Sequence, residues 1–260
     1  FARRIAASVQ ARADFLHRSG VAYGPGPSDR LDLFPAAGTS DAPVMIFIHG
    51  GFWRSLDAAL FSFVARGFVP HGAAVVVLDY PLIPEFRLAD IVTSCRLAIA
   101  WVHRHARTFG ASPDKLFVSG NSAGGHLAAL LADRAWPTTA GLPDDVIKGA
   151  CAMSGLYDLE PVRLSSQNDT LNLTGEEVER LSPSRQLPAR AAKTIFAVGA
   201  DETPEFLRQN RAIAEAWTAA GLPCAHDVVS AINHITIVLD AFAVPTHPLN
   251  IATRRLMGVA

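Results

Sequence analysis

Six short, largely apolar runs alternate along this chain with longer segments in which apolar residues recur every three to four positions. Short runs of near-continuous apolarity are typical of parallel strands that are buried on both faces, and the longer spacing is typical of amphipathic helices. The repeated strand–helix–strand order predicts an α/β fold with an open, mostly parallel central sheet and helices on both faces. The predicted strands are residues 44–48, 73–78, 116–119, 146–153, 194–198 and 225–229.

Three of the intervening segments have readable helix boundaries. Residues 88–108 carry apolar side chains at three- and four-residue steps, and Gly110 follows them as a typical helix stop. Residues 122–135 show the same spacing. Thr203 and the proline after it are expected to be the N-cap and first residue of a helix over residues 205–220.

Two regions depart from this alternation. Residues 1–40 begin with an amphipathic segment and continue into a turn-rich stretch, residues 23–35, for which we expect an antiparallel hairpin at the sheet edge. The apolar positions of the amphipathic segment are Ile5, Val9, Phe15 and Leu16. Residues 155–192 are polar and not strand-like, with Thr174 and Glu177 spaced as the capping box of a short helix. An insertion of this length between two strands is typical of a lid or cap.

The length and composition suit one large domain. Half of the 260 residues are apolar and 18% are charged, which predicts a single domain over residues 1–260 with the cap inside it. The 23 basic and 24 acidic side chains give a net charge of −1 with no basic cluster, so no nucleic-acid partner is expected. The apolar runs are far shorter than the roughly 20 residues of a membrane-spanning helix, so no membrane partner is expected either.

The cysteines bear on the compartment. Cys95, Cys151 and Cys224 are widely spaced in apolar surroundings, which suits reduced core thiols better than disulfides or a metal site. Reduced thiols, together with the absence of a leader in this sequence, predict a cytoplasmic protein. Because the chain begins with Phe1 rather than Met, this expectation concerns only the segment given.

The sequence GNSAG at residues 120–124 lies directly after a predicted strand and directly before a predicted helix. A sharp strand-to-helix turn strains the serine backbone, and side chains two positions away would collide with neighbouring backbone, which accounts for the two glycines. Such a turn exposes the hydroxyl of Ser122, and the backbone N–H of Ala123 at the helix start can face developing negative charge. The pattern predicts Ser122 as a nucleophile; the alternative is an N-cap serine after a glycine turn.

A second pair of glycines follows the strand over residues 44–48, in the sequence HGGFW at residues 49–53. Two successive glycines allow this backbone to approach the serine turn and to aim N–H groups into a shared space, as an acyl-transfer oxyanion requires. The predicted oxyanion hole consists of Gly50, Gly51, Phe52 and Ala123. The alternative is a glycine turn beside core aromatic residues.

These motifs resemble those of the α/β-hydrolase superfamily, in particular its kynurenine formamidase (arylformamidase) and related esterase branch. The resemblance covers most of the chain and rests on HGGFW at 49–53, DYPLIP at 79–84, GNSAGGHL at 120–127, SGLYDL at 154–159 and ETPEF at 202–206 with Gln209. At two positions that border the site, this chain has Asn121 and Phe52 where the formamidase pattern often has His and Tyr. The resemblance implies the α/β-hydrolase fold with a small cap insertion, and a serine hydrolase that needs no cofactor and no metal.

The base is expected late in the chain, because in this fold the nucleophile, the acid and the histidine follow in that order. His226 lies inside a predicted strand, and His247 lies between prolines. His234 follows a strand and a short turn, which is the loop position that a mobile imidazole needs. The resemblance assigns the base to His234; the alternative is a surface loop histidine.

The acid is expected after the strand over residues 194–198, where Asp201 and Glu202 are adjacent and cannot both point at one imidazole. Alignment of the ETPEF segment with the formamidase pattern favours Glu202, whereas the general statistics of the fold favour Asp. We predict Glu202, with Asp201 as the alternative. Asp158 is a third candidate, because some relatives take the acid after the preceding strand; otherwise it is a turn cap.

The predicted chemistry is acyl transfer from a small-molecule ester or amide through a covalent serine ester. Trp53, Asn121 and Tyr157 are expected to line the substrate pocket, although the two aromatic residues suit the core equally well, and His126 is expected to be structural. Hydrolysis of an aryl formamide such as N-formylkynurenine is favoured. A carboxylesterase or amidase with another acyl group and a non-catalytic binding protein on the same scaffold are the alternatives, and a homodimer is compatible with the sequence.

Overall fold

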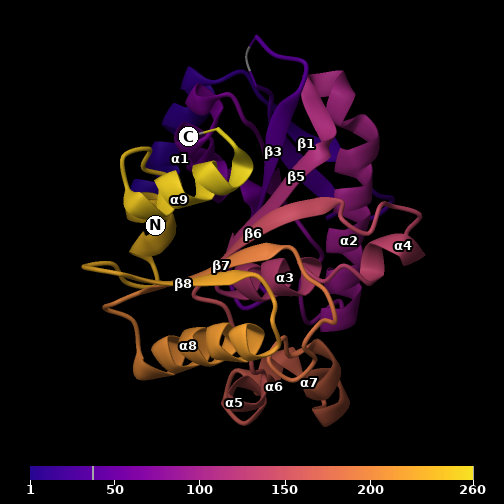
Figure 1. Cartoon of the computed structure of the whole chain (residues 1–260), viewed down its shortest axis with the longest axis vertical. Helices are drawn as coiled ribbons and strands as arrows, with labels where there is room; N and C mark the ends of the chain where they lie inside the picture. The colour runs from indigo at the N-terminus through magenta and orange to yellow at the C-terminus, as the bar shows by residue number, and fades with distance from the viewer. Residues whose placement is uncertain (37, 260) are drawn as a thin grey trace.

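A sheet of eight strands runs through the middle of the computed structural model, which describes residues 1–36 and 38–259 (Figure 1). The strands are β1 (Arg18–Ala22), β2 (Arg30–Phe34), β3 (Ala42–Ile48), β4 (Ala74–Leu78), β5 (Ala111–Asn121), β6 (Ile147–Met153), β7 (Lys193–Gly199) and β8 (Cys224–Val229). Their order in the sheet is β1-β2-β4-β3-β5-β6-β7-β8. β2 pairs antiparallel with β1 and with β4, and the strands from β4 to β8 pair in parallel, which confirms the predicted sheet.

Alternate residues of the central strands enter two cores, one on each face of the sheet. In β3, Ile46 and Ile48 belong to one core and Met45 and Phe47 to the other. β4 alternates in the same way, and its five residues are all buried. Burial on both faces is the reason why these strands read as continuous apolar runs in the sequence.

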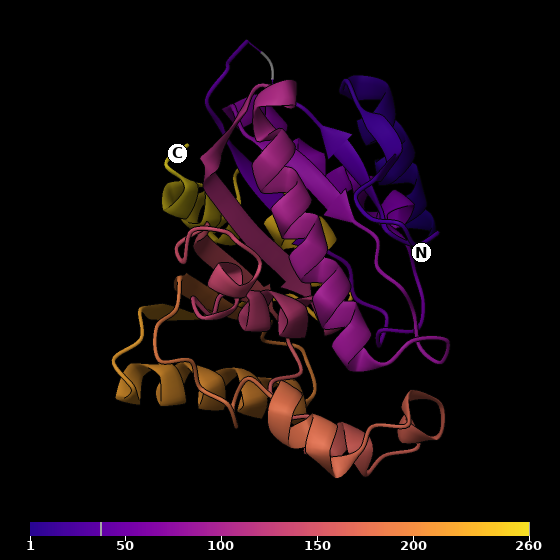
Figure 2. The same cartoon turned by 90° about the vertical axis from the view of Figure 1, so that its right-hand side faces the viewer.

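The helices cover both faces. They are α1 (Ala2–Asp14), α2 (Leu88–His105), α3 (Ala123–Leu131), α4 (Trp136–Thr139), α5 (Glu160–Arg163), α6 (Asn168–Leu171), α7 (Gly175–Leu181), α8 (Pro204–Ala219), α9 (Pro248–Met257), the 3₁₀ helices η1 (Ala58–Gly67), η2 (Val69–His71) and η3 (Ala106–Phe109), and the π-helical turn η4 (Ile237–Phe242). α1 and α9 lie on one side of the sheet and α2 and α3 on the other (Figure 1), and Figure 2 looks directly onto α2. None of the helices among the described residues combines the length and apolarity needed to cross a bilayer.

The helix boundaries agree with the sequence at two ends and differ at one. η3 ends at Gly110 with a left-handed backbone, and α8 begins at Pro204 after the N-cap Thr203. α3 ends at Leu131, four residues before the predicted end. The reason is that the chain pairs there with a later segment: the Ala192 N–H donates to Ala132 O (2.8 Å), and the helical hydrogen-bond pattern stops.

The N-terminal region contains the predicted helix and hairpin, but α1 packs the opposite way from its apolar pattern. It buries Arg4, Ser8 and Ala11 and leaves Ile5 and Val9 exposed. Two of its hydrogen bonds with η1 come from Arg12: Nε donates to Ser62 Oγ (2.9 Å), and Nη2 donates to the carbonyl of residue 59 (2.6 Å). Leu16 is exposed too, and Phe15 alone of the predicted apolar set packs against a core. The hairpin begins at β1, before the turn-rich stretch, rather than inside it.

Residues 155–192 contain α5, α6 and α7, which group together at one end of the molecule (Figures 1 and 2). The predicted capping box is present: Glu177 N–H donates to Thr174 Oγ1 (3.1 Å), and Thr174 N–H donates to Glu177 Oε2 (3.0 Å). Arg54, in the loop after β3, donates to Gln167 Oε1 (2.7 Å), so this segment contacts the predicted oxyanion loop. Its role as a cap stays a prediction.

Candidate active site

Ser122 occupies the turn between β5 and α3, with φ 60° and ψ −119°. A residue other than glycine is strained in this region of backbone conformation, and such strain gathers at functional sites. The Ser122 N–H donates to Met153 O (2.9 Å) at the end of β6, which fixes the turn against the neighbouring strand. The sharp turn expected from the sequence is present, and the role of Ser122 as nucleophile stays a prediction.

The glycines around this turn stand where no side chain fits. A Cβ atom would lie 2.2 Å from Gly124 O if added to Gly120, and 1.9 Å from Ile48 O if added to Gly124. A Cβ atom on Gly50 would lie 2.9 Å from Asn121 O. The end of β3 and the serine turn are therefore in backbone contact, as the two glycine motifs predict.

The loop after β3 turns through consecutive left-handed conformations. Gly51, Phe52 and Trp53 have φ values of 110°, 51° and 56°. Among the hydrogen bonds of residues 1–36 and 38–259, none uses the backbone N–H of Gly51, of Phe52 or of Ala123 as donor. The loop is fixed through other atoms, since Tyr80 Oη donates to His49 O (2.9 Å). Free backbone donors beside a serine can stabilise an oxyanion, but none of these contacts tests the predicted oxyanion hole.

Glu202 and His234 are joined by a hydrogen bond. His234 Nδ1 lies 2.7 Å from Glu202 Oε2, and the Glu202 side chain is fully buried whereas that of His234 is 26% exposed. Glu202 Oε1 accepts from Gly199 N–H (2.8 Å) and from Ser154 Oγ (2.5 Å). Phe206 packs beside the imidazole with ring centroids 4.2 Å apart. The carboxylate is thus fixed by two donors behind the ring that it orients.

The other two candidate acids lie elsewhere. Asp201 is exposed, and its backbone N–H donates to Ile232 O (3.0 Å). Asp158 Oδ1 accepts from Arg185 Nε (3.0 Å) and from Glu160 N–H (3.1 Å), which is the turn-cap alternative. Of the three carboxylates, only Glu202 contacts His234.

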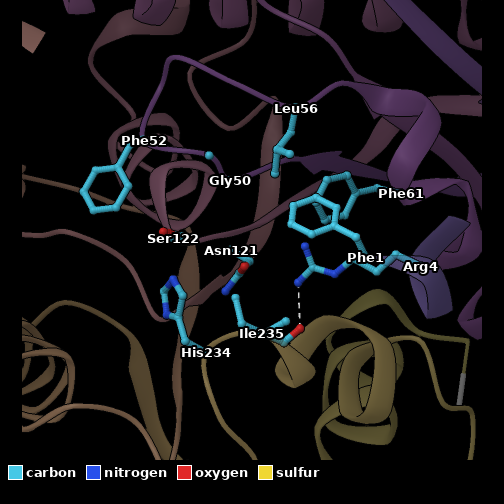
Figure 3. A pocket seen from close by; sticks show the side chains of 11 residues that line it. Phe1, Arg4, Gly50, Phe52, Leu56, Phe61, Asn121, Ser122, His234 and Ile235 are labelled. Carbon is cyan, nitrogen blue, oxygen red and sulfur yellow. Dashed lines mark hydrogen bonds between the residues drawn. The ribbon is translucent and has the colours of Figure 1, made fainter. Parts of the chain in front are cut away.

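Ser122 and His234 line the same cavity, of about 190 Å³ (Figure 3). The imidazole faces the serine in this view, although no hydrogen bond between the two side chains occurs among the described residues. Hydrogen bonds between catalytic groups are often long without substrate and shorten when it binds. The cavity is lined by Phe1, Arg4, Gly50, Gly51, Phe52, Leu56, Phe61, Asn121, Ser122, His234 and Ile235.

Two of the residues predicted for the substrate pocket lie outside this lining. Trp53 is fully buried and packs edge-on against His126, with ring centroids 5.1 Å apart. Tyr157 is fully buried as well, and its hydroxyl donates to Ala152 O (3.1 Å). Both match the core alternative, and only Asn121 of the predicted set lines the cavity.

Sequence reasoning missed the lining residues that come from α1 and η1, of which Arg4 and Phe61 are the clearest. Neither belongs to a motif, and both lie far from Ser122 in the sequence, so no spacing rule connects them with the site. It also gave no role to Ser154, the donor to Glu202. The left-handed backbone of Ser154, with φ 48°, is a structural signal without a counterpart in the sequence.

The buried histidines of the two motifs support the loops. Burial lowers the pKa of His126 to about 4, and its Nε2 lies 2.7 Å from Leu181 O in the segment of α7. Burial also lowers the pKa of His49 to about 4, and its ring stacks on Tyr80 with centroids 4.3 Å apart. Burial raises the pKa of Asp79 to about 6, although its carboxylate accepts from Ala58 N–H (2.6 Å).

The part of the chain that the structure describes has no cluster of three or more His, Cys, Asp or Glu side chains suited to a metal ion.

Comparison with known proteins identifies the family to which the chain belongs. The sequence profile of the BD-FAE family matches residues 31–178, more than half of the chain. The chain belongs to the BD-FAE family. This BD-FAE protein is 33% identical over 225 residues to the kynurenine formamidase of Danio rerio, covering 84% of this chain and 74% of that protein. It is 26% identical to the kynurenine formamidase of Drosophila melanogaster, covering 83% and 74% of the two chains.

Solved structures agree on the fold of the BD-FAE protein. A protein from Silicibacter sp. TM1040 superposes with a TM-score of 0.84 at 27% identity, covering 96% of this chain and 90% of that one. Esterase B from Lactobacillus rhamnosis superposes with a TM-score of 0.79 at 19% identity, covering 99% and 91%. The fold is that of the α/β-hydrolases, and with these relatives the chain is a hydrolase.

Proposed function

We propose that this hydrolase cleaves a small-molecule amide or ester through an acyl-enzyme, with Ser122 as nucleophile, His234 as base and Glu202 as the acid that orients the base. The observation that carries this proposal is the hydrogen bond of 2.7 Å between His234 and Glu202, at a cavity that Ser122 also lines. Ser122, Glu202 and His234 follow one another in the chain as nucleophile, acid and histidine, which is the order of this fold. The oxyanion donors of the proposal are the N–H groups of Gly51, Phe52 and Ala123.

The contacts support a defined course for the proton. With its Nδ1–H held by Glu202, the imidazole of His234 keeps the lone pair of Nε2 free for the proton of Ser122. As that proton leaves, Ser122 Oγ bonds to the substrate carbonyl carbon, and the carbonyl oxygen takes up negative charge. His234 then gives the proton to the departing amine or alcohol. Water, deprotonated by the same ring, releases the acid and restores the serine.

An aryl formamide such as N-formylkynurenine is the favoured substrate, because the Danio rerio relative is named a kynurenine formamidase. A cavity of about 190 Å³ is below the roughly 300–1,000 Å³ of drug-sized ligand sites, which suits a small acyl group. A carboxylesterase or amidase with another acyl group is the second candidate, because Asn121 and Phe52 line the cavity where the formamidase pattern often has other residues. The free thiols support a cytoplasmic enzyme, and the net charge of −1 supports one without a nucleic-acid partner.

The test is turnover of N-formylkynurenine beside a series of 4-nitrophenyl esters, with wild type and Ser122→Ala. We expect the variant to lose at least about 10⁴-fold in kcat while its melting temperature stays unchanged. Mass spectrometry after treatment with a phosphonate should find the adduct on Ser122. Retained activity in the variant would remove Ser122 from the mechanism, and a wild type that turns over neither substrate class would favour a binding protein.

A further inference from the structure

Ser154 occupies a strained position directly after β6. Its backbone is left-handed, with φ 48°, and the residue is fully buried. Glycine adopts this conformation without strain, whereas a residue with a Cβ atom does not, so a serine at this position costs stability. Strain of this kind gathers at functional sites, where other interactions of the residue offset it. The hydroxyl group is what distinguishes serine from glycine as an interaction partner here.

The hydroxyl of Ser154 has one hydrogen-bond partner among the described residues, the carboxylate of Glu202. Ser154 Oγ donates to Glu202 Oε1 over 2.5 Å. Neither side chain reaches solvent, so water does not compete for the carboxylate oxygen, and the hydrogen bond acts in surroundings of low dielectric constant. A hydroxyl that donates to an ionised carboxylate forms one of the stronger hydrogen bonds of proteins.

The backbone around Ser154 is anchored to β7 and to the serine turn. Ser154 N–H donates to Ala197 O (2.7 Å) in β7, the parallel neighbour of β6 (Figure 1). The carbonyl of the preceding residue, Met153, accepts from Ser122 N–H (2.9 Å). The end of β6 therefore holds the serine turn with a backbone carbonyl and the carboxylate of Glu202 with a side-chain hydroxyl. A shift of the turn relative to the carboxylate would break one of these hydrogen bonds.

The two oxygens of Glu202 have different partners. Oε1 accepts from Ser154 Oγ and from Gly199 N–H (2.8 Å), and Oε2 lies 2.7 Å from Nδ1 of His234. The terminal torsion of a glutamate side chain is soft, so the donors around the carboxylate determine its plane. A single donor on Oε1 leaves the carboxylate free to turn about that oxygen. The second donor restrains this rotation and keeps Oε2 directed at the imidazole.

We propose that Ser154 is a positioning residue for the acid: its hydroxyl fixes the plane of the Glu202 carboxylate and thereby the orientation of the His234 ring. This inference rests on the proposed serine hydrolase function and adds one side chain to it. Ser154 lies outside the described lining of the cavity, so it acts through Glu202 and not on the substrate. Its effect belongs to proton transfer, when the imidazole becomes positively charged and the carboxylate has to face it.

Two substitutions of Ser154 test this role. Ser154→Ala removes the hydroxyl, and Ser154→Gly removes it while relieving the left-handed backbone. With 4-nitrophenyl acetate, we expect both variants to lower kcat by about 5- to 50-fold and to keep KM within about 2-fold of wild type. A serine that served the backbone alone would be replaced by glycine without loss of kcat. Because Ser154→Ala can lower the melting temperature, Ser154→Gly keeps the test decisive.

Ser119→Ala is the matched control. Ser119 is as fully buried as Ser154 and lies in the neighbouring strand, but its Oγ donates to a backbone carbonyl, Cys151 O (2.9 Å). Loss of this hydroxyl should lower the melting temperature and leave kcat at the wild-type value. The comparison separates the loss of any buried hydroxyl from the loss of the one that holds the acid.

A double-mutant cycle with Glu202→Gln provides a readout that a structural role would not change. If Ser154 acts through Glu202, Ser154→Ala should lower kcat by less than about 2-fold in the Glu202→Gln background, far less than in wild type. The rate at which a 4-nitrophenyl phosphonate ester modifies Ser122, followed as release of 4-nitrophenol, should show the same pattern in the four proteins. This second measurement does not depend on the identity of the natural substrate.

The outcomes distinguish this inference from the proposed function. Wild-type kcat in Ser154→Gly, or equal losses from Ser154→Ala in both backgrounds, would overturn the positioning role of Ser154 and leave the proposed function intact. If Ser122 takes no phosphonate, or if Glu202→Gln and Ser122→Ala both keep the wild-type rate, the proposed function fails, and the positioning role fails with it.

Discussion

At the scale of single residues, both carboxylate oxygens of Glu202 have hydrogen-bond donors. Glu202 accepts one hydrogen bond from His234 and two from Gly199 and Ser154, and its side chain has no exposure to solvent. A carboxylate can only accept, so it suits three donors at once. An amide of the same shape would turn an NH₂ group toward one of those donors.

Glu202→Gln is therefore expected to lower kcat by about 10²- to 10⁴-fold, by misorienting the imidazole or fixing the wrong tautomer. Asp201→Asn is the matched control, because Asp201 is exposed and the hydrogen bond to the His234 ring comes from Glu202. It should retain the wild-type rate. Steady-state kinetics of both variants, with circular dichroism to verify folding, decide between the neighbours; a larger loss in Asp201→Asn would contradict the assignment.

The burial of His126 leads to a prediction of how the free energy of unfolding depends on pH. An unfolded histidine takes up its proton near pH 6.5, whereas burial lowers the pKa of folded His126 to about 4. Between these values the unfolded state binds more protons, so the free energy of unfolding should rise with pH from about 4 to 6.5. Its buried Nδ1 has no partner among the described residues, so a second proton finds no acceptor.

His126→Gln should flatten this pH dependence, since glutamine does not titrate and its amide can still donate to Leu181 O. The change should be up to about 3 kcal/mol across the window, measured by urea unfolding at several pH values. His49 is expected to contribute a similar slope that remains in the variant. An unchanged slope in His126→Gln would show that His126 is not protonated on unfolding.

At the scale of elements, the junction of β5 and α3 is the most crowded backbone contact of the site. Gly124 approaches the end of β3 so closely that an added Cβ atom would lie 1.9 Å from Ile48 O, and backbone there has no freedom to retreat from the sheet. This contact brings the loop after β3 and the serine turn together. The two glycine motifs are thus one structural device divided between two strands.

Gly124→Ala should destabilise the protein by more than about 2 kcal/mol, because the methyl group overlaps a main-chain oxygen. Gly175→Ala is the control: it lies at the first position of α7 with open space around it, and alanine favours helices, so its effect should stay within about 0.5 kcal/mol or stabilise. Chemical denaturation of both variants measures the difference. Equal stabilities would mean that the junction can relax.

The elements also show what periodicity can and cannot predict. The central strands are readable because both faces of the sheet are buried, so each apolar run marks a strand directly. The apolar face of α1 in the sequence is not the face that the helix buries. Its partner η1 presents acceptors such as Ser62 Oγ and Ala59 O, to which an arginine can donate and Ile5 or Val9 cannot. A buried face that is held by polar side chains cannot be recognised from apolar periodicity alone.

At the scale of the whole molecule, the motifs predicted the region of the site, and the long-range contacts completed it. Ser122, Glu202 and His234 each follow a strand, and parallel strands bring their carboxyl ends to one edge. The sequence leaves Asp201 and Glu202 as alternatives, because the backbone conformation of the loop after β7 decides which of the two carboxylates faces His234. Trp53 and Tyr157 face inward although their motifs border the cavity, and Arg4 reaches it from the far end of the sequence.

The two buried thiols test whether the molecule unfolds as one unit. Cys95, on α2, lies in the core on one face of the sheet, and Cys151, on β6, lies in the core on the opposite face. Burial raises the pKa of both thiols, that of Cys151 to about 12, so neither reacts until the chain opens. If residues 1–260 form a single domain, both cores should open together.

In a Cys224→Ser background, which removes the half-buried third thiol, Cys95 and Cys151 should therefore be labelled at the same urea concentration. That concentration should match the midpoint seen by far-ultraviolet circular dichroism. Mass spectrometry of the labelled peptides separates the two sites. Labelling of Cys95 well before Cys151 would show that one face of the sheet opens independently, because the hydrogen-bonded strands between the two cores would then have survived the loss of the helices over one of them.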